Sequence, residues 1–348
     1  MLMENDFLEA CYFSKKAGLI FWYKNMNNSI TDIPGIAVGH WTNLESITGC
    51  TAILCPTGSL GGVSVRGASP GTRETDVLHP SNRVDEIHAI MLSGGSAYGL
   101  AAADGAMRYL EGKGIGVKVG GNVVPIVPSA ILFDLGIGEG GVRPDSESGY
   151  QACEFASSDP VEQGCVGAGT GATVGKTQGP QRSVKGGLGS ASIDLGEGLL
   201  VGALVVVNAI GSVHDPENGS LIAGPRGDKS MSSSINDLIS GNSFKLPDIN
   251  GNTTIGVVVT NAKLTKAQAA RMAASSHDGL ALAIRPSHLI GDGDTMFSIS
   301  TGEQGGIDGY GDMNRIIAGT IKAVSLAILN AINFAETMGG VPSVKDFS

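Results

Sequence analysis

Residues 250–261 read Asn-Gly-Asn-Thr-Thr-Ile-Gly-Val-Val-Val-Thr-Asn, and the interpretation of the whole chain depends on this stretch. Asn-Gly favours a tight turn, and a run of β-branched residues favours a buried strand. Thr253 is therefore predicted to open a strand directly after a turn. From these residues alone, the stretch is either an ordinary turn before a strand or a site where a threonine hydroxyl acts as nucleophile.

The surroundings of Thr253 favour a nucleophile. Residues 211–252 are rich in Ser, Asn, Asp and Gly, which predicts a long surface loop, and such loops are usually functional or disordered. A threonine hydroxyl needs a base, and no Ser–His–Asp arrangement is visible. Cleavage of the Asn252–Thr253 bond would free an α-amino group whose pKa of about 8 suits it to that task.

Short aliphatic runs bounded by Gly, Pro, Asn and Asp recur on the amino-terminal side of this stretch and predict strands of a buried sheet. They cover residues 36–38, 51–54, 62–65, 87–92 and 115–119. Two longer runs, 188–193 and 199–207, flank Gly196-Glu197-Gly198 and predict a hairpin.

Helical patterns interrupt the strands. Apolar residues from Leu100 to Leu110 lie on one face, and Thr265 with Gln268 forms a capping box for a helix that runs through Leu280. The last helix carries a stripe from Met313 to Ile328. Strands mixed with helices throughout predict an α/β or α+β protein.

Bulk composition excludes several classes of function. The net charge of −10 argues against nucleic-acid partners and against anionic membranes. Five cysteines, an odd number without a C-x-x-C spacing, argue against a disulfide framework and a structural zinc site. The six histidines show no H-x-x-x-H pair, so a zinc hydrolase is not supported and each is interpreted as structural. No cofactor is expected.

The amino-terminal segment lacks the features of a secretory signal. Glu4, Asp6 and Glu9 stand where a signal would carry Lys or Arg, and the apolar run 19–23 is too short to span a bilayer. We interpret residues 1–27 as an extension and residues 28–348 as a single catalytic domain. A cytoplasmic location is expected.

Two glycine-rich stretches approach known motifs but fail on spacing. Residues 167–177 resemble a phosphate-binding loop, but Thr170 stands where the pattern needs glycine. Residues 94–98 resemble a nucleophile elbow, but Tyr98 replaces the final glycine. Nucleotide binding and a Ser–His–Asp hydrolase are therefore not expected.

Six motifs in a fixed order resemble one family across nearly all of residues 30–340. The chain is similar to the self-processing N-terminal-nucleophile β-aminopeptidases and L-aminopeptidase/D-amidase-esterases, including the nylon-oligomer (6-aminohexanoate oligomer) endo-hydrolase. The motifs are residues 66–76, 93–100, 167–172, 205–208, 252–255 and 291–295. The resemblance implies a four-layer αββα sandwich, processed into pieces 28–252 and 253–348.

The resemblance also implies roles for particular residues. Thr253 matches the nucleophile and Asn252 the residue before the cut. Asn208 matches an amide that stabilises the tetrahedral oxyanion. Lys176 matches a lysine near the nucleophile, whose charge would lower the pKa of a neighbouring amine.

Three further residues match the family's site. Asp292 and Asp294 correspond to acidic or polar positions beside the freed amine, and Tyr98 to a tyrosine lining the substrate pocket. From the residues alone, the two Asp residues could equally be turn formers, Lys176 a solvated lysine and Asn208 a strand cap. Homo-oligomers, often tetramers, are the family's assembly.

The expected activity is hydrolysis of a short peptide or small amide through a threonine ester. The Asn-Thr junction resembles that of the nylon-oligomer hydrolase, whereas many aminopeptidase members cut before serine. Two alternatives remain open. One is an acyltransferase similar to ornithine acetyltransferase, which has the same fold, and the other is a binding module that never cleaves.

Overall fold

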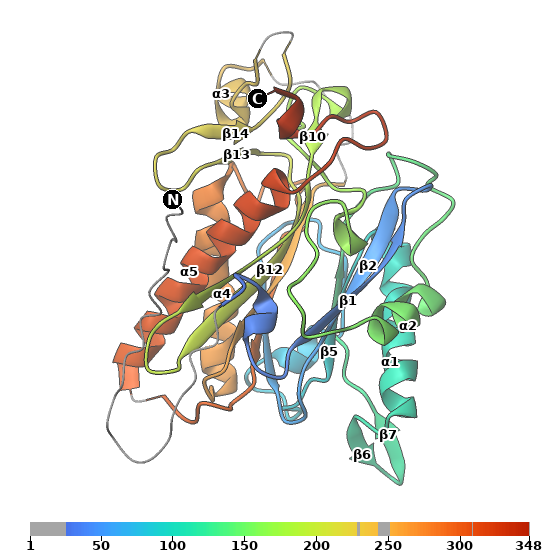
Figure 1. Cartoon of the computed structure of the whole chain (residues 1–348), viewed down its shortest axis with the longest axis vertical. Coiled ribbons are helices and arrows are strands. Elements are labelled where there is room, and N and C mark those ends of the chain that lie inside the picture. The colour runs from blue at the N-terminus through green and yellow to red at the C-terminus, as the bar shows by residue number, and fades with distance from the viewer. Residues whose placement is uncertain (1–25, 228–229, 243–250, 308, 348) are drawn as a thin grey trace, which may run out of the picture.

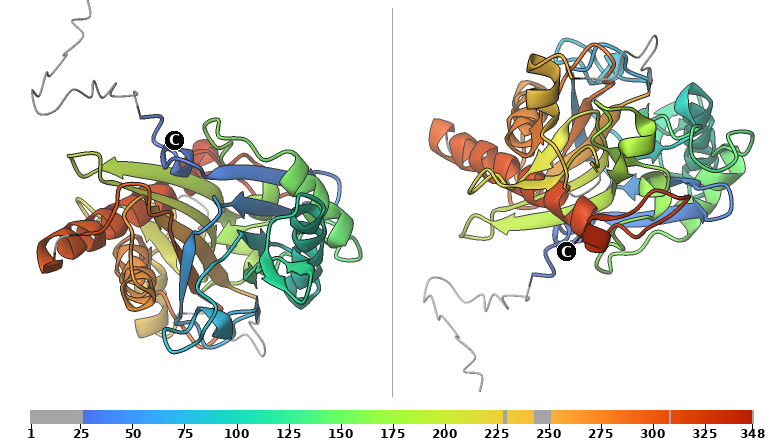
Figure 2. Two further views of the ribbon diagram at one scale, coloured as in Figure 1. Left: turned by 90° about the horizontal axis from the view of Figure 1, so that it is seen from below. Right: turned by 90° about the horizontal axis from the view of Figure 1, so that it is seen from above.

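Two five-stranded sheets lie face to face, and helices cover the outer side of each (Figures 1 and 2). The computed structural model describes residues 26–227, 230–242, 251–307 and 309–347. Figure 2 shows α4 and α5, in orange and red, on one side of the strands and α1 and α2, in teal to green, on the other. The expected four-layer αββα sandwich is confirmed.

The first sheet has the strand order β1-β2-β5-β8-β4. Neighbouring strands are antiparallel except β5 and β8, which are parallel. The strands are β1 (Ala37–Asn43), β2 (Thr48–Leu54), β5 (Ala89–Ser93), β8 (Ser129–Ile131) and β4 (Thr72–Arg73). Helices α1 (Ala102–Gly112) and α2 (Ser146–Glu154) pack together, and α2 contacts β1 and β2.

The second sheet has the order β11-β12-β15-β17-β3 and contains the predicted hairpin. Its strands are β11 (Gly187–Asp194), β12 (Leu200–Asn208), β15 (Thr253–Thr260), β17 (Thr295–Ser300) and β3 (Leu60–Val65). Only β15 and β17 run parallel among these pairs. Helix α5 (Gly309–Asn333) covers β11 and β12, and α4 (Lys266–Ala283) covers β3 and β17.

Smaller elements connect these layers. They are η1 (Ile30–Asp32), η2 (Asp76–Leu78), η3 (Ser96–Ala101), β6 (Val117–Val119), β7 (Asn122–Val124), η4 (Gly167–Gly169), β9 (Thr173–Val174), η5 (Pro180–Arg182), β10 (Val184–Lys185), β13 (Ser212–His214), β14 (Leu221–Ala223), α3 (Ser234–Ile239), β16 (Ile284–Arg285) and η6 (Val344–Phe347).

Alternation along the strands divides the core into three layers. On β15, Ile255, Val257 and Val259 face the first sheet, while Val258 faces α4 and α5. On β5, Ile90 faces the second sheet, while neighbouring residues pack under α1 and α2. Successive strand side chains point to opposite faces, so each strand serves two layers. The near-continuous apolar sequence of these strands follows from burial on both faces.

Helix α5 is long and apolar enough to cross a membrane by length and composition, with a mean hydropathy of 1.6 over its most apolar window. In the fold, 56% of that window is buried, and the helix packs on β11, β12 and α4. The apolar stripe therefore belongs to the protein core.

Two expectations about local structure were wrong. The stretch 211–252 is not one surface loop, because its described part contains β13, β14 and α3, with Val213 and Ser234 buried. The run 115–119 does not enter a buried sheet. It supplies β6 of a separate two-stranded hairpin with β7, where Val119 is exposed. The 115–119 run is too short for periodicity to show what covers it, and the elements within 211–252 are only three to six residues long, with the same limit.

The inter-sheet layer yields a stability prediction. Phe297 of β17 is fully buried between the sheets. Phe297→Ala should lower the free energy of unfolding by about 3–5 kcal/mol, because the large cavity left behind cannot fully collapse. Urea denaturation followed by circular dichroism measures this. The control Phe155→Ala, at a mostly exposed side chain, should stay within about 0.5 kcal/mol, and equal losses would contradict the layer assignment.

Candidate active site

Thr253 is the first residue of β15, and Asn208, the last residue of β12, is its partner across the sheet. By strand alternation, Thr253 shares a face with Ile255, and Asn208 shares a face with Val206. Both of those apolar residues lie in the layer between the sheets. The Thr253 side chain therefore points into the end of the inter-sheet layer, and Thr253 is only 4% exposed.

The peptide bond before Thr253 is held from two sides. Thr253 Oγ1 donates to the carbonyl oxygen of Asn252 at 2.5 Å. The backbone N–H of Gly293 donates to the same oxygen at 2.9 Å. Asn252 also forms a parallel β-bridge with Asp292. The hydroxyl and a polarising donor thus meet at one carbonyl group.

Asn208 uses both ends of its side-chain amide. Its Nδ2 donates to the carbonyl oxygens of Phe133 at 3.1 Å and Gly251 at 3.0 Å. Its Oδ1 accepts from the backbone N–H of Thr173 at 3.0 Å and from Lys176 Nζ at 2.8 Å. In the uncleaved chain, Asn208 therefore holds the residue two places before Thr253.

Lys176 is buried, and its ammonium group points to Asn208. Nζ donates to Asn208 Oδ1 and, at 3.1 Å, to the Asn208 backbone carbonyl. Burial lowers the pKa of Lys176 to about 7, although the charge of Asp292 opposes this shift and that of Lys185 reinforces it. Near neutral pH, Lys176 can therefore give or take a proton.

Asp292 pairs with Asn252, and Asp294 bonds to Thr254, so these two residues flank the Asn252–Thr253 bond. Burial is the main reason why the pKa of Asp292 is raised, and the neighbouring Asp294 adds to it. Asp292 Oδ2 accepts from Leu289 N–H at 2.8 Å, whereas its Oδ1 is buried without a partner. Asp294 Oδ1 accepts the backbone N–H of Thr254 at 2.6 Å. One carboxylate therefore anchors the residue after the nucleophile.

The motif at residues 66–76 holds the backbone of Asp292 and Asp294 through its own backbone N–H groups. The N–H groups of Arg66 and Gly67 donate to the Asp294 carbonyl at 3.0 and 3.1 Å, and Ser69 N–H donates to the Asp292 carbonyl at 2.9 Å. A Cβ on Gly67 would lie 2.2 Å from the Asp294 nitrogen, so only glycine allows this approach. Motifs far apart in sequence meet at Thr253.

Comparison with known proteins agrees with this architecture. Residues 28–345 match peptidase family S58. The chain is 40% identical to an uncharacterised aminopeptidase of Mycobacterium tuberculosis over 92% of this chain and 97% of that protein. It is 32% identical to the 6-aminohexanoate-oligomer endohydrolase of Kocuria sp. over 78% of this chain and 74% of that protein.

The chain belongs to peptidase family S58. The L-aminopeptidase D-Ala-esterase/amidase of Ochrobactrum anthropi, described as a variant of the Ntn-hydrolase fold, has the same fold, with a TM-score of 0.68. It is 20% identical and covers 90% of this chain and 88% of its own. The S58 chain is therefore a peptide or amide hydrolase of the aminopeptidase type.

Tyr98 lies apart from the hydrogen-bonded cluster of this S58 peptidase. It belongs to η3, is 61% exposed, and stacks against the Arg143 guanidinium, 3.8 Å from the ring centroid. Within the described ranges, no side-chain hydrogen bond joins Tyr98 to Thr253, Asn208 or Lys176. Its role in substrate binding stays a prediction.

Sequence reasoning missed two members of the cluster. The Gly293 N–H donates to the Asn252 carbonyl, but a backbone donor cannot be recognised from the residue type. His288 donates from Nδ1 to Asp294 Oδ2 at 2.7 Å. It was interpreted as structural because it has no partner at a recognisable spacing. Its place three residues before the 291–295 motif was the available signal.

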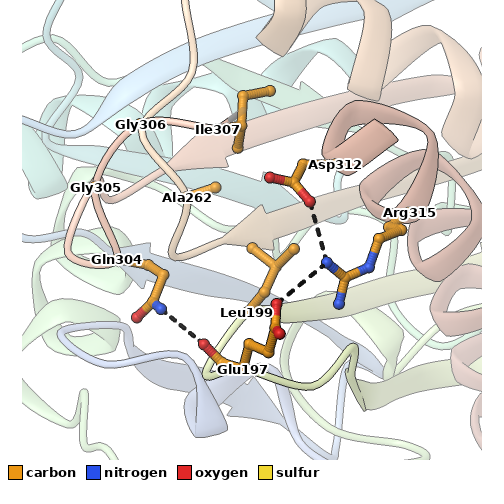
Figure 3. A pocket seen from close by; sticks show the side chains of 9 residues that line it. All are labelled: Glu197, Leu199, Ala262, Gln304, Gly305, Gly306, Ile307, Asp312 and Arg315. Atoms are coloured by element: carbon orange, nitrogen blue, oxygen red, sulfur yellow. Dashed lines mark hydrogen bonds and ion pairs between the residues drawn. The ribbon is translucent and has the colours of Figure 1, made fainter. Parts of the chain in front are cut away.

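A surface hollow lies at the opposite end of the second sheet (Figure 3). Leu199 and Ala262, which flank the far ends of β12 and β15, contribute to its lining. Arg315 pairs there with Asp312 at 3.0 Å and lies 3.9 Å from Glu197. The length of β15 separates this hollow from Thr253 by about 20 Å. It is therefore not part of the Thr253 site.

In the part of the chain that the structure describes, no three His, Cys, Asp or Glu side chains are placed to share a metal ion.

The buried Asp292 carboxyl predicts a pH effect on stability. Its pKa lies above the unfolded value of 3.8. The folded protein therefore keeps a proton that the unfolded chain has lost, and this group's contribution to stability falls as pH rises from about 4 to 7. Asp292→Asn removes that loss and keeps an acceptor for Leu289 N–H. Both proteins in the comparison carry Thr253→Ala. The free energy of unfolding of the Asp292→Asn variant minus that of its parent should be larger at pH 7.5 than at pH 4.5. A difference that is the same at both pH values in urea denaturation would contradict burial as the cause.

Proposed function

We propose that the chain cleaves itself between Asn252 and Thr253, and that Thr253 then serves as the nucleophile of an amide hydrolase. The observation that carries the proposal is the geometry at the Asn252 carbonyl. Its oxygen lies 2.5 Å from the Thr253 hydroxyl and also accepts the Gly293 N–H. Membership of an aminopeptidase family supports the same chemistry.

Self-cleavage begins with an N→O acyl shift. Thr253 Oγ1 attacks the Asn252 carbonyl carbon, and the hydroxyl proton passes to a base. Lys176 and Asp292 are the buried groups whose pKa values are displaced toward neutrality. Negative charge gathers on the Asn252 oxygen, where the Gly293 N–H donates. The C–N bond then breaks, the Thr253 nitrogen takes a proton, and an ester links Asn252 to Thr253 Oγ1.

Water hydrolyses that ester and completes processing. The products are an Asn252 carboxylate, a free Thr253 hydroxyl and a free Thr253 α-amino group. An unperturbed α-amino group has a pKa of about 8, so a useful fraction is neutral near pH 7 and can accept the hydroxyl proton in later turnovers.

Turnover repeats the same steps on an external amide. The Thr253 hydroxyl attacks the substrate carbonyl, the amine product leaves with a proton, and water releases the acid from the ester. Once the 251–252 segment moves away, Asn208 Nδ2 loses Gly251 as an acceptor and can bond the substrate oxyanion. Lys176, bonded to Asn208 Oδ1, holds the amide in that orientation.

The proposed substrates are short peptides and linear amides. The relative from Kocuria is named for hydrolysis of 6-aminohexanoate oligomers, and the relative from M. tuberculosis is named an aminopeptidase. Both names describe hydrolysis of amide bonds. A homo-oligomeric assembly, implied by the family resemblance, and a cytoplasmic location, expected from the sequence, complete the proposal.

Processing provides the first test. The purified protein should give two tightly associated fragments that begin and end at the Asn252–Thr253 bond, while Thr253→Ala should remain one chain because it has no hydroxyl. Thr253→Ser keeps the hydroxyl and serves as the matched control that still cleaves. Intact-mass spectrometry measures all three. Active, pure enzyme showing only the full-length mass would overturn the nucleophile assignment.

The oxyanion role of Asn208 gives a kinetic prediction. Asn208→Ala should lower kcat of the processed enzyme about 10²–10³-fold with little change in KM, because the lost bond matters mainly in the transition state. Steady-state kinetics on a chromogenic anilide, with cleavage confirmed by mass, measures this. Parent-like turnover by fully cleaved Asn208→Ala would make Asn208 a structural strand cap.

A further inference from the structure

His288 lies outside the roles assigned so far, yet it makes two bonds to one carboxylate oxygen. Its ring Nδ1 donates to Asp294 Oδ2 at 2.7 Å, and its backbone N–H donates to the same oxygen at 3.1 Å. Both atoms belong to one residue, so the position of His288 fixes one side of the Asp294 carboxylate.

The backbone of His288 adopts a conformation that a side chain disfavours. Its φ is +58°, in the left-handed region where non-glycine residues are uncommon. Such conformations persist where the surrounding structure enforces them, and they gather at functional sites. In this conformation, the backbone N–H and the ring Nδ1 of His288 both reach Asp294 Oδ2.

A second histidine holds the ring in place. His277, on α4, packs edge-to-face against His288, with ring centroids 4.8 Å apart and planes at 70°. Its Nε2 faces the Ser64 carbonyl at 2.9 Å and must donate, because a carbonyl only accepts. Burial lowers the pKa of His277 to about 4, so the supporting ring is neutral at pH 7. It can pack against His288 without like-charge repulsion.

The other oxygen of Asp294 reaches the nucleophile's neighbour. Oδ1 accepts the Thr254 backbone N–H at 2.6 Å. Rotation of the carboxylate would therefore weaken its bond to Thr254 or its bonds to His288. The orientation of the 253–254 peptide plane, and with it the direction of the Thr253 hydroxyl, depends on that carboxylate.

We infer that His288 is a positioning residue that holds Asp294, and through it Thr253, in the geometry needed for both self-cleavage and amide hydrolysis. The inference rests on the proposed function. His288 acts through Asp294 and touches no reacting atom.

Two substitutions separate the ring donor from the backbone conformation. His288→Asn keeps a side-chain N–H near the position of Nδ1, and Asn tolerates the left-handed region. His288→Gly removes the donor but fits that region with less strain than any other residue. If only the backbone mattered, the Gly variant would perform at least as well as the Asn variant.

The expected result is the opposite order. His288→Asn should cleave itself and turn over within about threefold of the parent. His288→Gly should slow both reactions by about tenfold or more, as expected for loss of a hydrogen bond to a charged group. Its KM should stay within about twofold, because His288 does not bind substrate. Self-cleavage is followed by intact mass, and turnover is measured on fully cleaved protein with the chromogenic anilide.

His88 offers a matched control. It is a buried histidine of the first sheet's core, whose Nδ1 accepts the Ile126 N–H at 3.0 Å. His88→Asn should lower Tm without lowering kcat. His288→Gly at parent rates, or His288→Asn as slow as His288→Gly, would overturn the positioning role while Thr253→Ala still proves the nucleophile. A parent protein that never cleaves would instead refute the proposed function itself.

Discussion

The pairing of β12 with β15 sets the position of Thr253 and Asn208 at the Asn252–Thr253 bond. Its register places Asn208 directly opposite Thr253 and runs without interruption to Val201 opposite Thr260. A slip of one residue would turn each side chain of β15 to the other face, so Thr253 would point at the helices. Apolar residues on both faces of β15 oppose such a slip, because it would exchange the contents of two packed layers. The core therefore specifies the active-site geometry.

Around the Asn252–Thr253 bond, Asn208 and Asp294 are better bonded than Asn252. Asn208 has partners for both ends of its amide, and both oxygens of Asp294 accept N–H groups. Asn252, by contrast, is buried with neither its amide nitrogen nor its amide oxygen bonded. A buried polar group without a partner costs about 1–3 kcal/mol. The proposed cleavage would remove that cost by releasing Asn252, while the bonds of Asn208 to Lys176 and of Asp294 to Thr254 would remain.

Local signals in the sequence predicted much of the fold. The capping box of Thr265 and Gln268 is present, α5 contains the expected stripe, and the hairpin closes around Gly196-Glu197-Gly198. The elements missed, such as β8 and β13, are three-residue strands whose pairing depends on distant partners. A three-residue strand is too short for a hydrophobic period to show which distant strand it pairs with.

Prediction of the candidate site from the sequence had similar limits. The sequence located Asn208, Lys176 and both Asp residues only through resemblance, since nothing in their spacing requires them to meet. The Gly293 donor could not be found from the sequence because it is a backbone group, and His288, which reaches Asp294 through a left-handed turn, had only its place before the 291–295 motif as a signal. The resemblance to a known family identified residues, and only the structure shows which atoms meet.

Thr253 is 4% exposed, and its hydroxyl donates to the carbonyl of its own preceding peptide bond. The segment that supplies this bond also occupies the amide that the later reaction needs, because Gly251 accepts from Asn208 Nδ2. Gly251 is tightly enclosed as well, since a Cβ there would lie 2.6 Å from the Phe133 ring. Departure of residues 251 and 252 would therefore expose the hydroxyl, free the Asn208 donor and vacate space beside Phe133 together. The proposed self-cleavage would in this way convert a packed strand end into a substrate site, and the same enclosure that buries the Thr253 hydroxyl holds it against its own peptide carbonyl.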